Sequence, residues 1–169
     1  LDALHQSAAD PAQLFRPDGL MLCYPVISSG AFCHPGSFER LLGKREDFIT
    51  KYGEDTDYER ARRWFSLETQ VHASTPRTFV WQTVEGDVVP VQNSLLLVNA
   101  LVEHGIPVEY HLYPKGVHGL SLSTEEVAEP EKKRGVDLHI ADWFERAIDW
   151  LLYSEDSISS TNLECGKNE

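Results

Sequence analysis

Short apolar runs that stop at glycine or proline are the feature that most constrains the fold of this chain. Residues 19–24 are continuously apolar up to Pro25, and residues 78–82, entered after Pro76 and apolar at 79–81, are a second strand of this kind. Runs of this length are typical of strands buried on both faces, as in a parallel sheet. Residues 108–113 alternate instead, which predicts a strand at a more exposed edge.

A helix is expected after each of the last two strands. The first spans about 90–104, with Pro90 suited to its first turn and Gly105 to its exit. Its apolar residues at helical spacing are Val91, Leu95, Val98 and Val102. The second spans about 139–153 and should cover one face of the sheet; its apolar positions are Ile140, Trp143, Phe144, Ala147, Ile148 and Leu151. The strand, helix, strand, helix order predicts an α/β fold with a mostly parallel sheet.

The remaining segments set the domain organisation. Residues 28–75 interrupt the strand and helix order with short charged helical pieces such as 58–64. We interpret them as a lid-like insertion packed over the carboxyl ends of the strands. Residues 1–153 are therefore expected to form one partial domain, and residues 154–169 a polar C-terminal tail. Because the chain opens at Leu1 and its only methionine is Met21, we expect its native N-terminus to lie upstream.

Charge and composition exclude several classes of partner. The 15 basic and 27 acidic residues give a net charge of -12, which argues against nucleic acid. No apolar run approaches the roughly 20 residues of a membrane helix, so no membrane contact is expected. The cysteines show no metal-ligand spacing and cannot all pair within one chain, which favours a reducing, cytoplasmic location; they are Cys23, Cys33 and Cys165. Histidine spacing gives no metal site either, and no cofactor is expected.

Candidate catalytic residues lie in the loops that follow the second and third strands. Ligands of open α/β sheets bind outside the carboxyl ends of the strands. Glu85 and Asp87 follow the second strand, and His118, flanked by glycines, follows the third. An acid and then a histidine in this order is what a Ser, Asp, His triad requires. The acid would orient His118, which would take the proton of a serine and return it to the leaving alcohol.

Each loop has a simpler structural interpretation when taken alone. A Glu-Gly-Asp loop is commonly a solvated turn, and a histidine between glycines is commonly structural. Only their pairing, in order and each after a strand, indicates the triad. The other notable side chains receive structural roles: the serines Ser28, Ser29, Ser37 and Ser121 are not on a strand-to-helix elbow, Trp64, Phe65 and Trp81 are expected in the core, and Tyr24 and Pro25 on the floor of the pocket.

Several blocks between residues 12 and 122 resemble a bacterial family of α/β-hydrolase esterases related to acetyl xylan esterases and to prolyl-oligopeptidase-type hydrolases. The matching blocks are Arg16-Pro17-Asp18, Tyr24 to Ser28, Gly36 to Gly43, Ser66-Leu67-Glu68, Val88 to Leu96, and Lys115 to Leu120. The resemblance implies the C-terminal part of an α/β-hydrolase fold and places the histidine of the family at His118.

Two departures from the family matter for activity. The family carries its nucleophile in a Gly-x-Ser-x-Gly elbow upstream of the first strand found here, and no such motif occurs in this sequence. The family's aspartate falls at Gly86. Asp87 is the first candidate for the acid, through a one-residue shift of the loop, and Glu85 is the second, because glutamate also serves as a triad acid on this fold. The chain alone is therefore expected to be inactive.

The resemblance implies a carboxylic ester hydrolase acting on a small-molecule or carbohydrate ester, with xylan-type acetyl esters as one candidate class. Two alternatives remain open at this stage. The first is a non-catalytic binding module that keeps the fold, and the second is a serine peptidase of the prolyl-oligopeptidase type. The sequence leaves the acyl group and the oligomeric state open.

Overall fold

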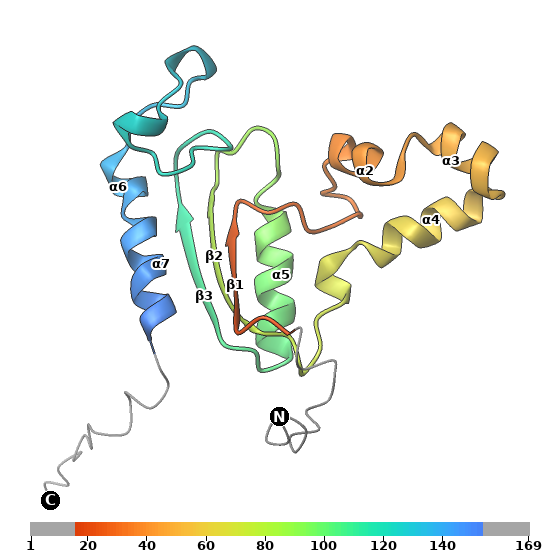
Figure 1. Ribbon diagram of the computed structural model, residues 1–169, viewed down its shortest axis with the longest axis horizontal. Coiled ribbons are helices and arrows are strands. Elements are labelled where there is room, and N and C mark those ends of the chain that lie inside the picture. Colours follow the sequence, from red (N-terminus) through yellow and green to blue (C-terminus); the bar gives the residue numbers. More distant parts are fainter. Residues whose placement is uncertain (1–15, 154–169) are drawn as a thin grey trace, which may run out of the picture.

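A computed structural model of the protein describes residues 16–153 and contains one parallel sheet (Figure 1). Its strands are β1 (Gly19–Cys23), β2 (Arg77–Thr83) and β3 (Val108–Tyr113), in the order β1-β2-β3. All three lie where the apolar runs predicted them. Because the strands are parallel, their carboxyl ends share one edge of the sheet. The predicted tail, residues 154–169, lies outside the described residues.

Helices cover both faces of the sheet, as predicted (Figure 1). Successive residues of β2 point to opposite faces. Val80 packs against α5 (Gln92–Glu103), whereas Phe79 and Trp81 pack against the C-terminal helices α6 (Leu138–Ala141) and α7 (Trp143–Leu152). Trp81 is fully buried and stacks on Trp143 with ring centroids 5.0 Å apart. The expectation that Trp81 belongs to the core is confirmed.

Helix α5 buries a different face from the one that its apolar spacing predicted. Leu95 is 44% exposed and Val102 62% exposed. The buried residues of α5 are Asn93, Ser94, Leu97, Ala100 and Leu101. The prediction was therefore wrong for Leu95 and Val102, whereas Val98 is partly buried against the core. It missed three apolar residues of the buried face, and it missed Asn93 and Ser94 because they are polar and are buried through hydrogen bonds.

The last helix is broken rather than continuous. The Asp137 carboxylate accepts hydrogen bonds from the backbone N–H groups of His139 and Ile140 and so caps α6. Helix α7 begins after Asp142, whose carboxylate accepts a hydrogen bond from the Tyr113 hydroxyl at 2.6 Å. The predicted positions 140, 143 and 147 are buried, whereas 144 and 151 are exposed.

The predicted insertion between β1 and β2 is present. It contains α2 (Pro35–Leu42), α3 (Arg45–Tyr52), α4 (Asp55–Trp64) and the short 3₁₀ helix η2 (Leu67–Thr69). Its placement differs from the prediction, because α3 and α4 extend to the side of α5 instead of lying over the strand ends (Figure 1). Trp64, expected in the core, is 68% exposed at the end of α4.

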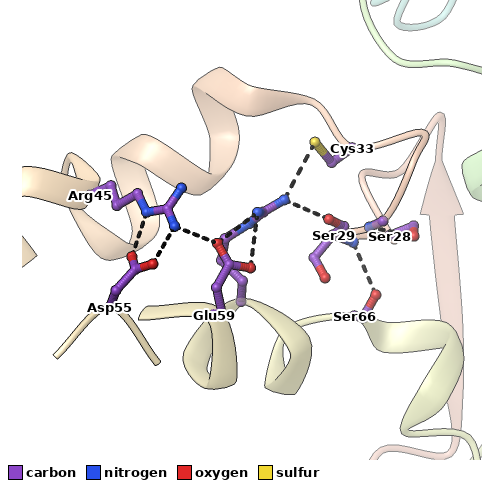
Figure 2. Close-up of polar contacts among 9 residues, drawn as sticks. Ser28, Ser29, Cys33, Arg45, Asp55, Glu59 and Ser66 are labelled. Atoms are coloured by element: carbon purple, nitrogen blue, oxygen red, sulfur yellow. Dashed lines mark hydrogen bonds and ion pairs between the residues drawn. The ribbon is translucent and has the colours of Figure 1, made fainter. Parts of the chain in front are cut away.

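Ion pairs and backbone hydrogen bonds hold this insertion together (Figure 2). Arg45 pairs with Asp55 and Glu59, which ties α3 to α4. The Arg62 guanidinium donates a hydrogen bond of 2.6 Å to the Ser29 carbonyl and so ties α4 to the loop that follows β1. Because Arg45 and Asp55 are solvent-exposed, water screens this ion pair and it adds little to stability. These contacts set the position of the insertion more than its stability.

The long loop between β3 and α6 carries two further 3₁₀ helices, η3 (Glu125–Val127) and η4 (Pro130–Lys132). Within it, Arg134 pairs with Glu129 at 2.7 Å. No helix in residues 16–153 is long and apolar enough to cross a membrane.

An apolar groove lies on the α5 face of the sheet beside β1. It has a volume of about 420 Å³, and its apolar lining includes Leu20, Leu22, Ile27, Leu97 and Leu101. In the described part of the chain β1 pairs only with β2, so its outer edge has no neighbouring strand. Unpaired strand edges favour association with other chains.

We expect the isolated 169-residue chain to be marginally stable, with a free energy of unfolding below about 5 kcal/mol, and to self-associate through β1. Met21→Lys adds charge to this strand, where Met21 is 40% exposed, and should reduce association. Val102→Lys on α5 is the matched control and should leave it unchanged. Sedimentation and thermal unfolding at several concentrations measure both quantities. A sharp, concentration-independent unfolding transition from a monomer would contradict this expectation.

Candidate active site

The loop that follows β2 carries both candidate acids. It leaves the sheet at Thr83 and reaches α5 after Pro90. The Val84 backbone N–H donates to the Tyr113 carbonyl at 2.8 Å, and the Gln82 side-chain amide donates to the Val89 carbonyl at 2.9 Å. The two ends of the loop are thus fixed to the sheet, while Glu85 and Asp87 are exposed between them. We refer to residues 84–90 as the acid loop.

The loop that follows β3 holds His118 in a tightly curled backbone. Gly116 and Gly119 adopt φ values of 118° and 79°, which favour glycine. A Cβ atom on Gly116 would lie 2.8 Å from Leu120 and 2.9 Å from Ile140, so no side chain fits there. Leu120 is buried in the core below. The two glycines that flank His118 in the sequence therefore serve to bring it close to the sheet.

The imidazole of His118 lies half-buried against Tyr24. Their rings meet edge to face with centroids 4.8 Å apart. Burial lowers the pKa of His118, and the charges of Arg134 and His34 lower that pKa further, while Asp87 raises it. The imidazole is consequently neutral near pH 7, which is the form that a general base requires.

Asp87 and His118 meet, and Glu85 stays apart. The Asp87 Oδ1 atom accepts a hydrogen bond from the backbone N–H of His118 at 3.4 Å. The imidazole Nδ1 of His118 is buried and has no hydrogen-bond partner in the structure of residues 16–153. No hydrogen bond joins Glu85 to His118 in the same region. The two loops therefore converge, with Asp87 as the acid whose charge acts on the histidine.

The Asp87–His118 pair differs from the acid–histidine pair of a triad in one hydrogen bond. In a triad the carboxylate accepts the Nδ1–H of the imidazole, whereas here it accepts the backbone N–H of the same residue. Hydrogen bonds of this kind are often long or misaligned without substrate and tighten in the reacting complex. The unpartnered Nδ1 and the neighbouring carboxylate are compatible with such a rearrangement.

Tyr24 and Pro25 were both expected on the floor of the pocket, but they lie on different surfaces. Tyr24 contacts His118, and its backbone N–H donates to the Trp81 carbonyl at 2.7 Å. Pro25 lines the apolar groove on the α5 side instead. The chain turns between them, because Tyr24 adopts a positive φ of 40°.

The serines have structural roles, as the sequence indicated. Ser28 is buried, and its hydroxyl donates to Glu68 at 2.7 Å. The Ser66 hydroxyl accepts a hydrogen bond from the Ser29 backbone N–H at 3.0 Å (Figure 2). Ser37 is hydrogen bonded to the Nδ1 of His34 at 2.9 Å. Among residues 16–153, no hydrogen bond joins any of these serines to His118, and no group of three or more potential ligands gathers to hold a metal ion.

Sequence reasoning missed three residues of this region. Arg134 and His34 act on His118 through their charges, and Asn93 lies fully buried below the acid loop. Arg134 comes from the irregular segment before α6, which carries no periodic signal. His34 lies two residues before the start of the block at residues 36–43 that resembles the esterase family, and this was the signal available for it.

Burial of His118 should make stability depend on pH. Because its pKa is lowered in the folded state, the unfolded chain binds a proton below about pH 6.5 that the folded chain does not. The wild-type chain should therefore lose stability relative to His118→Gln as the pH falls from about 7.5 to 5, and the two should keep a constant difference above that range. Urea unfolding of both proteins measures this. A difference that stays constant or grows in favour of wild type at low pH would contradict it.

A parallel sheet covered by helices on both faces, with an acid loop and a histidine loop at one edge, defines the α/β-hydrolase class. Comparison with known proteins refines this assignment. The sequence profile described as "Prolyl oligopeptidase family" matches residues 39–150. The chain belongs to the prolyl oligopeptidase family.

Relatives of known name are longer than this chain. Endo-1,4-beta-xylanase B of Butyrivibrio fibrisolvens is 45% identical over 111 residues, which are 66% of this chain and 16% of that protein. An acetyl ester-xyloside bifunctional hydrolase from Caldicellulosiruptor lactoaceticus superposes with a TM-score of 0.61 at 35% identity, covering 80% of this chain and 42% of that one. A sugar hydrolase from Lactococcus lactis gives a TM-score of 0.63 at 31% identity, covering 82% and 49%.

A carboxylesterase from Lactobacillus plantarum is also similar, with a TM-score of 0.63 at 29% identity over 80% of this chain and 44% of that one. The chain thus spans less than half of each of these three solved structures. Its structural neighbours are α/β-hydrolase esterases, including enzymes of the acetyl xylan esterase type.

Proposed function

We propose that the intact protein is a serine esterase that hydrolyses carboxylic esters, with acetylated xylan-type carbohydrate as its substrate class, and that this chain supplies the acid and the base of its triad. The observation that carries the proposal is the convergence of Asp87 and His118 at the carboxyl ends of neighbouring parallel strands. The family and the esterase neighbours support the same reaction class.

In the proposed mechanism His118 acts as the general base. Its neutral imidazole takes the proton from a serine hydroxyl as the serine attacks the ester carbonyl, and then returns it to the leaving alcohol. Asp87 stabilises the imidazolium that forms between these steps. In this proposal the serine comes from a segment outside these 169 residues, because the Gly-x-Ser-x-Gly elbow that the resemblance implies does not occur in this sequence. Water then attacks the acyl-enzyme: His118 takes a proton from the water and returns it to the serine as the acid product leaves.

The carbohydrate class is supported by the names of the relatives. One similar enzyme is called an acetyl ester-xyloside bifunctional hydrolase, another a sugar hydrolase, and the curated relative is a xylanase. These names favour an acetylated sugar over a peptide, although the family is named for its peptidases.

A non-catalytic binding module is the second candidate. Glycine occupies position 86, where the resemblance places the family's aspartate, and the Asp87 carboxylate contacts the backbone of His118 rather than its imidazole. Both features would suit a protein that keeps the fold without the chemistry.

Ester hydrolysis separates the two candidates. The isolated 169-residue chain should show no turnover of p-nitrophenyl acetate above its own His118→Ala variant, because no acyl-enzyme can form without the nucleophile. The same chain extended by the upstream segment should hydrolyse p-nitrophenyl acetate and release acetate from acetylated xylan. Turnover by the short chain would contradict the proposed source of the serine, and an inactive extended protein would favour the binding module.

A further inference from the structure

We propose that Asn93 is a positioning residue, which joins the acid loop to the segment that follows β1 and so fixes Asp87 relative to His118. A role of Asn93 in catalysis rests on the proposed esterase function, whereas its effect on the position of Asp87 relative to His118 does not. Asn93 is the second residue of α5 and is completely buried.

The side chain of Asn93 uses all of its hydrogen-bonding capacity. Its Oδ1 accepts from the backbone N–H groups of Ile27 and Ser28, both at 2.9 Å. Its Nδ2 donates to the carbonyls of Phe32 at 2.8 Å and Pro90 at 3.0 Å. An amide offers two lone pairs and two N–H groups, so all four are satisfied by backbone. One side chain thus joins residues 27–32 to the end of the acid loop.

The next residue supports the same loop from another side. Ser94 is also completely buried, and its hydroxyl donates to the Oε1 atom of Gln82. The Nε2 atom of Gln82 then donates to the Val89 carbonyl at 2.9 Å. The carbonyls at positions 89 and 90 are therefore both held by buried amides, and Asp87 lies two residues before the first of them.

The segment that Asn93 binds on its other side also reaches the site. It continues from Phe32 to His34, whose charge acts on the imidazole of His118. Asn93 thus lies between two stretches of chain that both border His118. A residue that only stabilised α5 would need no hydrogen bonds to residues 27–32, which come more than sixty positions earlier.

The test measures how strongly Asp87 acts on His118. In the full 169-residue chain, Asp87→Asn should lower the His118 pKa followed by NMR, because it removes a nearby negative charge. In an Asn93→Ala background the shift caused by Asp87→Asn should fall to less than half. Arg134, His34 and Tyr24 also face His118, but they are present in every variant, so the comparison isolates Asp87.

Asn99→Ala is the matched control. Asn99 lies on the same helix and is exposed, and its side chain donates to Glu103 at 2.8 Å, away from both loops, so the full shift should persist. A full shift in folded Asn93→Ala would overturn the proposal. If Asn93→Ala does not fold, Asn93→Ser keeps a polar group at this position but cannot make all four hydrogen bonds, so it should still reduce the shift; an unchanged shift in that folded variant would overturn the proposal equally. Because the titration needs no turnover, it decides the role of Asn93 even if the extended protein proves inactive.

Discussion

Replacing His118 by alanine in the extended, active protein is expected to lower kcat for an acetyl ester by at least about 10³-fold, with little change in KM. General base catalysis by a positioned side chain contributes about 10²- to 10⁴-fold, and members of a triad act as a unit, so losing one removes most of the benefit. His118 is the histidine that lies at the carboxyl ends of the strands with an acidic residue beside it.

His104→Ala provides the control for this substitution. His104 lies exposed at the end of α5, where its ring bonds the carbonyl of Ala100 in its own helix. We expect the kcat of the His104→Ala variant to stay within about twofold of wild type, because substitutions at exposed positions away from a site usually have small effects. Steady-state kinetics with circular dichroism to verify folding compares the two. If His118→Ala retained wild-type kcat, the binding-module interpretation would take first place.

Replacing Asp87 by asparagine is expected to lower kcat about 10²- to 10⁴-fold, because the histidine loses the charge that stabilises its protonated form and orients its ring. Glu85→Gln should stay within about twofold, since Glu85 is exposed and makes no hydrogen bond to His118 in the described structure. Both substitutions preserve size and remove one charge. A larger loss in Glu85→Gln would assign the acid to Glu85, and an equal loss in the two variants would contradict the assignment to Asp87 alone.

Position 86 offers a rescue experiment. A Cβ atom there would lie 3.2 Å from the Thr83 hydroxyl and 3.4 Å from its carbonyl, so a side chain fits after a small adjustment. Aspartate at 86 would stand where the resemblance places the family's acid. Adding Gly86→Asp to Asp87→Asn should therefore recover at least about tenfold in kcat. Gly86→Asn in the same background adds the volume without the charge and should recover nothing.

The sequence predicted those features of the site that depend on residues close together in the chain. His118 and the acid loop were identified because each directly follows an apolar run, and parallel strands bring their carboxyl ends to one edge. The sequence favoured Asp87 over Glu85 only through its shorter side chain and its position next to residue 86, and it could not show which carboxylate lies against His118. This depends on how the loop turns between Thr83 and Pro90, and both ends of that loop are fixed by partners elsewhere in the fold.

The sequence by itself determined the three strands, the helix after β2, the amphipathic C-terminal segment and the insertion, because apolar periodicity and the stops at glycine and proline act over a few residues. Only the tertiary structure decided which face of α5 is buried. Asn93 can be buried because its amide bonds the backbone of residues 27, 28 and 32, more than sixty positions away. Burying a polar group is unfavourable unless such partners exist, and a local pattern contains no information about partners that only the folded chain brings together.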